Sequence, residues 1–205
     1  MQPRVSRELA DRRGSSWNER HDNRVGNPAY RASDACQKPP SDVETMQYWE
    51  TYLNDHRAGA TAGTALARRI WRSNRRTKWG PIIEEVAQSI EQDLVVLDEL
   101  RAATGISGGD LKRAAALLTE RASRLKLNGH LLTYSPLSRV LELETLMSAV
   151  RGKQSLWVTL RTAAPSHPEW SDFDFAVLEK RGSQQMESLE RVHEWAVTEM
   201  MGAGT

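Results

Sequence analysis

The sequence has little of what marks a secreted or membrane-embedded protein. It contains one cysteine, Cys36, which excludes an intramolecular disulfide. No apolar run approaches the roughly 20 residues of a membrane span, and residues 1–13 lack the apolar stretch of a secretion signal. Acidic and basic residues nearly balance, at 27 and 28, so the net charge selects no partner. These absences favour a cytoplasmic protein.

The composition also has few features of β structure. Only two phenylalanines occur, β-branched runs are few, and alanine, leucine, glutamate and arginine are abundant. These abundant residues are good helix formers. The sequence shows no strand pattern, internal repeat or glycine-rich phosphate loop, and it therefore predicts an all-α protein.

Residues 1–42 differ from the rest of the chain. Arginine, aspartate, asparagine, serine, glycine and proline dominate there, and the few apolar residues show no period. Such a segment buries too little apolar surface to offset the entropy of ordering it. We therefore expect a disordered tail over 1–42, followed by a helical bundle domain over 43–201.

Apolar residues recur every three or four positions through that domain and predict five helices. We expect Ser171 or Asp172 to cap the last helix, and Gly105 to end the second one. In the first helix, Gly59 and Gly63 lie in a run of small residues that lets another helix approach closely. The predicted ranges are 41–74, 81–104, 111–128, 135–162 and 172–201.

Short connections between these helices fit an up-and-down bundle. In this interpretation the four long helices form the bundle itself, and the shorter helix at 111–128 serves as a crossover or cover. The predicted fold is thus a four-helix bundle with one additional shorter helix.

Four ionisable residues fall where the helical pattern expects apolar side chains: His56, Asp93, Glu144 and His193. Burying such a group costs several kcal/mol unless it is paired, hydrogen-bonded or metal-bound. In one interpretation they are structural. The histidines are then satisfied by neighbouring carboxylates or carbonyls, and the two carboxylates pair with Arg, Tyr or His.

In a second interpretation these residues bind a metal ion. Glu190 and His193 form a Glu-x-x-His pattern, whose side chains share one helical face. Glu144 falls at a similar depth in the bundle, whereas His56 and Asp93 are offset from each other by roughly 9 Å along a helix axis. Carboxylate and imidazole together suit Fe, Mn or Zn. The chain has no second Glu-x-x-His, which a full di-metal site requires.

A basic segment follows at the end of the first predicted helix, with no acidic residue between 64 and 81. Basic residues beside tryptophans can bind nucleic-acid phosphates or an anionic membrane surface. They can also complement the helix dipole and stay solvated. Basic residues within 112–126 extend the patch if the two segments are adjacent. The candidate anion-binding residues are Arg68, Arg69, Arg72, Arg75, Arg76 and Lys78.

Four stretches resemble a group of uncharacterised actinobacterial helical proteins: YLNDHRAGATAGTA at 52–65, LKLNG at 125–129, SPLSR at 135–139 and LELETLMSAVRGKQSLW at 141–157. The resemblance covers roughly 46–200. The helical layout is also similar to the ferritin-like bundle class. That second resemblance rests on the architecture and one Glu-x-x-His pattern, and it implies a fold rather than an activity.

We therefore expect a non-catalytic structural or interaction module that works with a protein partner or a second copy of itself. A ferritin-like metal-binding protein is the first alternative, and nucleic-acid binding through residues 68–78 is the second.

Overall fold

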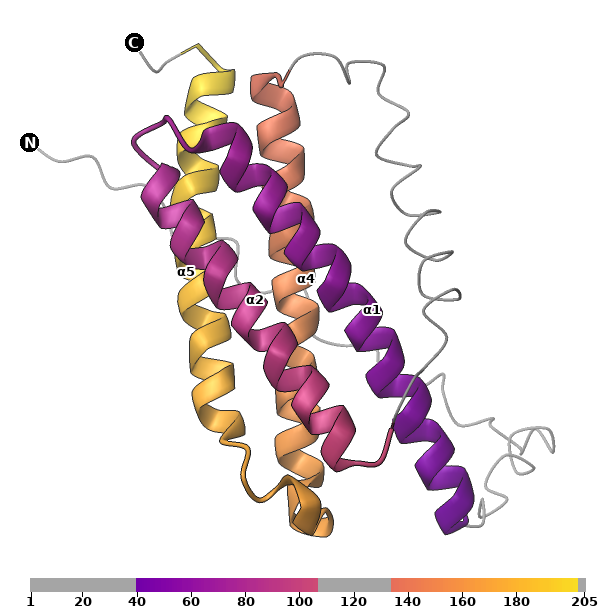
Figure 1. Ribbon diagram of the computed structural model, residues 1–205. Coiled ribbons are helices and arrows are strands. Elements are labelled where there is room, and N and C mark those ends of the chain that lie inside the picture. Colours follow the sequence, from indigo (N-terminus) through magenta and orange to yellow (C-terminus); the bar gives the residue numbers. More distant parts are fainter. Residues whose placement is uncertain (1–39, 107–133, 203–205) are drawn as a thin grey trace, which may run out of the picture. The chain divides into compact units, whose positions relative to one another are not determined.

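The computed structural model describes residues 40–106 and 134–202. The described residues form helices and contain no strand, which confirms the all-α prediction for this part of the chain. The expected tail at 1–39 and the expected helix at 111–128 lie outside the described residues. The long helices, shown in Figure 1, are α1 (Asp42–Asn74), α2 (Gly80–Ala103), α4 (Pro136–Ala163) and α5 (Phe175–Met200), with the short 3-10 turns η2 (Ala164–Ser166) and η3 (Pro168–Trp170) before α5.

The helix boundaries agree closely with the sequence pattern except at the start of α5. Asp174 caps this helix, because its carboxylate accepts a hydrogen bond from the Val177 backbone N–H at 3.0 Å. The expected caps Ser171 and Asp172 precede Asp174 by three and two residues, so that prediction was wrong. Gly105 has a φ of 74° just beyond α2, as a residue ending a helix requires.

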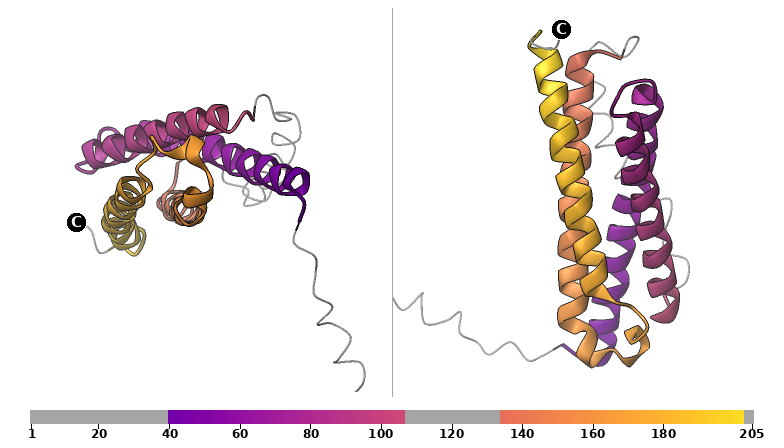
Figure 2. Two further views of the ribbon diagram at one scale, coloured as in Figure 1. Left: turned by 90° about the horizontal axis from the view of Figure 1, so that it is seen from below. Right: turned by 90° about the vertical axis from the view of Figure 1, so that its left-hand side faces the viewer.

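Contacts at the helix ends fix the direction of each helix. Asn74 at the end of α1 bonds Arg139 at the start of α4, and Trp79 at the start of α2 packs on Trp195 near the end of α5. Hence α1 and α5 run in one direction and α2 and α4 run in the other (Figures 1 and 2). Helices α2 and α4, which follow one another among the described helices, are therefore parallel, and a strictly alternating order of these four helices does not allow this. We call the end that holds Asn74 and Trp79 the turn end.

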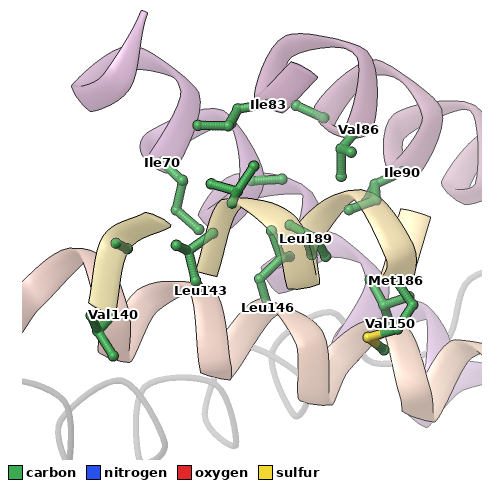
Figure 3. Close-up of a cluster of buried hydrophobic side chains, with 14 residues drawn as sticks. Ile70, Ile83, Val86, Ile90, Val140, Leu143, Leu146, Val150, Met186 and Leu189 are labelled. Atoms are coloured by element: carbon green, nitrogen blue, oxygen red, sulfur yellow. The ribbon is translucent and has the colours of Figure 1, made fainter. Parts of the chain in front are cut away.

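Among the long helices that the structure describes, each has two neighbours: α1 packs on α2 and α4, and α5 packs on the same two helices. Two apolar clusters fill the space between them. One lies toward the turn end and is drawn in Figure 3, and the other lies toward the opposite end. The first includes Ile70, Ile83, Val86, Leu143, Leu146 and Leu189, and the second includes Leu53, Leu97, Leu100, Leu156, Trp157 and Trp170.

The structure changes the predicted core faces of α1 and α4. On α1, Gly63 is buried with Ala149 Cβ 3.8 Å from the position that its own Cβ would take, as the small-residue prediction expects. Gly59 is exposed, with nothing within 4 Å of that position. On α4 the buried side chains include Val140 and Leu143, so the neighbouring stripe that contains Glu144 faces away from the core.

None of the helices in the described ranges is both long enough and apolar enough to cross a bilayer.

Candidate functional site

The most buried carboxylate in the described part of the bundle is Asp93, on α2, with 1% of its surface exposed. Arg181 of α5 donates a hydrogen bond to one carboxylate oxygen at 2.8 Å. Gln185 of α5 donates to the other oxygen at 2.9 Å, and Lys153 of α4 donates to that same oxygen. Asp93 therefore joins three helices and pairs with arginine, as the structural interpretation of the sequence expects.

Gln185 completes this buried network with its second set of bonds. Its amide nitrogen donates to Ser89 Oγ at 2.7 Å, and its amide oxygen accepts from Lys153. Close packing of α4 and α5 supports the network, because a Cβ on Gly182 would lie only 2.9 Å from Gln154 Cγ. We call Ser89, Asp93, Lys153, Arg181 and Gln185 the polar layer.

The polar layer lies between the two apolar clusters. On α2, Asp93 stands between Ile90 of the turn-end cluster and Leu97 of the other. On α4, Lys153 likewise stands between Val150 and Leu156. Buried charges must lie beside their ion-pair partners, so the polar layer fixes the axial register of α2, α4 and α5 relative to one another.

The charges of the polar layer do not suit a metal cation. One carboxylate faces two basic side chains, and both of its oxygens already accept hydrogen bonds. Burial lowers the pKa of Lys153, although the nearby Asp93 carboxylate opposes this shift. A metal ion bound at Asp93 would have to displace or repel two cations, so the layer does not fit the Fe, Mn or Zn site of the metal-binding interpretation.

The other candidate ligands lie near the surface. His193 Nε2 is 3.3 Å from Glu144 Oε1, so the sequence placed these two residues at the same depth correctly. Glu144, however, has 53% of its side chain exposed, and Glu190 is exposed as well. Glu144 was therefore wrongly assigned to the core, because the buried stripe of α4 runs along the adjacent face.

His56 is partly buried and lies away from these residues. Its ring packs edge-on against Tyr52, with the centroids 4.5 Å apart. Burial lowers the pKa of His56, and the charge of Asp55 partly opposes the shift. Within the described ranges, no three His, Cys, Asp or Glu side chains lie close enough together to hold a metal ion.

The basic segment separates into two parts. Arg68 pairs with Glu91 on α2, and Arg69 pairs with Glu142 on α4 at 2.8 Å, so these two arginines join helices. Burial raises the pKa of Glu142, and Arg69 opposes this rise. The other four residues are exposed, and none of them pairs with an acidic residue of the described ranges. We call these four the basic turn: Arg72, Arg75, Arg76 and Lys78.

The backbone that carries the basic turn is held by a dense set of hydrogen bonds. The buried Asn74 side chain donates to the Ile70 carbonyl and to the Tyr134 hydroxyl, each at 2.8 Å, and accepts from Arg139 Nε at 2.7 Å. Thr77 donates to the Asn74 carbonyl through its backbone N–H at 2.9 Å and its hydroxyl at 2.8 Å. The exposed cations thus project from a fixed turn.

Of the polar layer, the sequence pattern indicates only Asp93. Asp93 was found because it interrupts an apolar stripe, whereas its partners Lys153, Arg181 and Gln185 lie beside such stripes. Lysine and arginine reach inward from these flanking positions through long apolar stems. Helical periodicity does not report such side chains, so no signal of this kind could have identified them.

Comparison with known proteins gave no match: no protein-family model, no curated protein and no solved structure proved similar to this chain.

Proposed function

We propose that the chain is a non-catalytic helical module that acts through its surface and binds a partner there. The observation that carries the proposal is the polar layer, in which Asp93 is held by Lys153, Arg181 and Gln185. The ionisable groups at the centre of the bundle are used to join helices, which leaves none of them available to bind metal or substrate. The single cysteine, which excludes an intramolecular disulfide, supports a cytoplasmic location.

We further propose a ferritin-like architecture for the bundle. Ferritin-like folds are four-helix bundles with one long crossover connection. The parallel course of α2 and α4 supports this assignment, because α2 ends at the opposite end and α4 begins at the turn end (Figure 1). In this proposal the polar layer occupies the middle of the bundle, where members that bind metal carry their carboxylate ligands.

The test is the metal content of the full-length protein, purified without a metal-affinity tag and incubated anaerobically with Fe(II). The proposal predicts far less than one metal ion per chain. A double variant, Glu144→Ala with His193→Ala, should have the same low content, since neither residue belongs to a metal site.

Near-stoichiometric Fe, Mn or Zn that is lost in the double variant would overturn the proposal and establish a metal-binding protein. A second variant, Asp93→Asn, distinguishes a metal site in the polar layer from one at Glu144 and His193. Stoichiometric metal lost only in that variant would place the ion in the polar layer and would equally contradict the proposed function.

A further inference from the structure

The turn end gathers positive charge that forms no ion pair with an acidic residue of the described ranges. The basic turn contributes four exposed side chains within seven residues. It precedes α2, which has no side-chain cap and no acidic residue in its first turn. The N-terminus of a helix carries a partial positive charge, so α2 adds to the potential of the basic turn.

The acidic residues of this end that the structure describes are not paired with the basic turn. Glu199 of α5 is paired with Arg139 of α4. Glu84 and Glu85 follow in the second turn of α2, beyond its first-turn N–H groups. Arg72, Arg75 and Arg76 therefore face solvent as a local excess of cations on a chain whose overall charge is close to neutral.

Exposed apolar side chains lie at the same end of the bundle. Leu137 at the start of α4 is 50% exposed, and Met200 and Met201 at the end of α5 are 38% and 73% exposed. Figures 1 and 2 show these two helix ends beside the turn between α1 and α2. Cations combined with exposed apolar side chains are typical of proteins that bind an anionic lipid surface.

The aromatic side chains of this end argue against a single-stranded nucleic acid as the partner. Single-stranded nucleic acids stack their bases on exposed rings. Trp71 and Trp79 are only partly exposed and pack against the turn-end cluster, and the Lys78 ammonium lies 5.6 Å from the centre of the Trp79 ring. These rings are used within the protein, which leaves cations and flexible apolar side chains for the partner.

We propose that the turn end docks on a bilayer surface rich in anionic phospholipid. The basic turn binds lipid phosphates, while Met200, Met201 and Leu137 enter the apolar boundary beneath the headgroups. This proposal rests on the proposed function, a module that binds through its surface, and it names the surface and the partner. Membrane attachment here is peripheral and reversible, and it weakens as salt screens the charges.

The experiment is co-sedimentation of the full-length protein with vesicles. Phosphatidylcholine vesicles that contain phosphatidylserine are compared with vesicles of phosphatidylcholine alone. We expect binding only to the anionic vesicles. A triple variant, Arg72→Glu, Arg75→Glu and Arg76→Glu, should bind at least roughly 100-fold more weakly, because each basic residue near such a surface contributes about fivefold to the affinity.

The matched control reverses the same number of exposed charges elsewhere on the bundle, with Arg151→Glu, Lys180→Glu and Arg191→Glu. Its net charge equals that of the triple variant, so retained binding shows that the location of the charges decides the result. A second pair tests the apolar contribution. Met200→Ser with Met201→Ser should weaken binding, whereas Val158→Ser with Val177→Ser, which alters exposed residues near the opposite end, should not. Circular dichroism verifies that every variant is folded.

Three results would overturn the proposal: equal binding to both kinds of vesicle, undiminished binding of the triple variant, or equal loss in the control. Binding of duplex or single-stranded nucleic acid without vesicle binding would also overturn it and identify a polynucleotide partner. Each of these results leaves the metal test of the proposed function unaffected, so the two proposals fail separately.

Discussion

At the scale of single residues, the central feature is a carboxylate buried with more positive than negative charge around it. Asp93 is almost inaccessible, and its bonds to Lys153 and Arg181 offset the cost of removing all three groups from water. Removing the carboxylate leaves two buried or partly buried cations without their partner. The stability of the bundle therefore depends on this residue much more than on the exposed carboxylates of the same helices.

We expect Asp93→Ala to lower the free energy of unfolding by about 3–5 kcal/mol, the cost of breaking a buried ion pair. Glu190→Ala is the control, because Glu190 is exposed and its loss should change the stability by about 0.5 kcal/mol or less. Urea denaturation measures both values. Similar stabilities for the two variants would contradict the central place of Asp93.

At the scale of elements, the turn between α1 and α2 is tightly constrained. The Gly80 N–H donates to the Thr77 carbonyl at 3.0 Å. A Cβ on Gly80 would lie 2.7 Å from the Arg75 carbonyl oxygen, which is closer than real side chains come. Glycine is thus required at the start of α2 for space, because the backbone of the preceding turn passes directly over it.

The substitution Gly80→Ala should therefore destabilise the protein by about 1–3 kcal/mol, the usual cost of forcing atoms into a packed site. Gly59→Ala, in the open middle of α1, should instead stabilise it by about 0.5–1 kcal/mol, because alanine is the better helix former. Thermal or urea unfolding distinguishes the two. If both substitutions changed the free energy of unfolding in the same direction, Gly80 would not be sterically constrained as described.

At the scale of the whole helical unit, two apolar clusters lie on either side of the polar layer. The four long helices each contribute to both clusters, so neither cluster forms without the helices that build the other. The polar layer joins α2, α4 and α5 between them. We therefore expect the described helices to unfold together rather than as two halves.

Leu189→Ala in the turn-end cluster and Leu97→Ala in the other should each cost about 2–5 kcal/mol, as deletions of fully buried leucines do. Both should shift one single urea transition, followed in parallel by tryptophan fluorescence and circular dichroism. Val177→Ala, an exposed position, serves as the control and should change little. Two separated transitions would contradict the cooperative arrangement. So would fluorescence and circular dichroism curves that coincide in one leucine variant but not in the other.

For the described ranges, the sequence by itself determined the helical class, the helix boundaries within a few residues and the buried position of Asp93. These properties follow from local rules: helix propensity, apolar periodicity, and proline and glycine at helix ends. Local rules also predicted correctly that Glu144 and His193 lie at the same depth in the bundle. Each residue adds the same rise along a helix, so counting residues from the connection that two antiparallel helices share gives their depth.

Tertiary structure decided the rest. Periodicity gives a helix an apolar face, but which of two adjacent stripes turns inward depends on the neighbouring helices, and this buried Leu143 while leaving Glu144 exposed. Only packing brought Lys153 and Arg181 onto Asp93, because they lie 60 and 88 residues away along the chain. The parallel course of α2 and α4 was likewise set by contacts between helix ends, which no local pattern encodes.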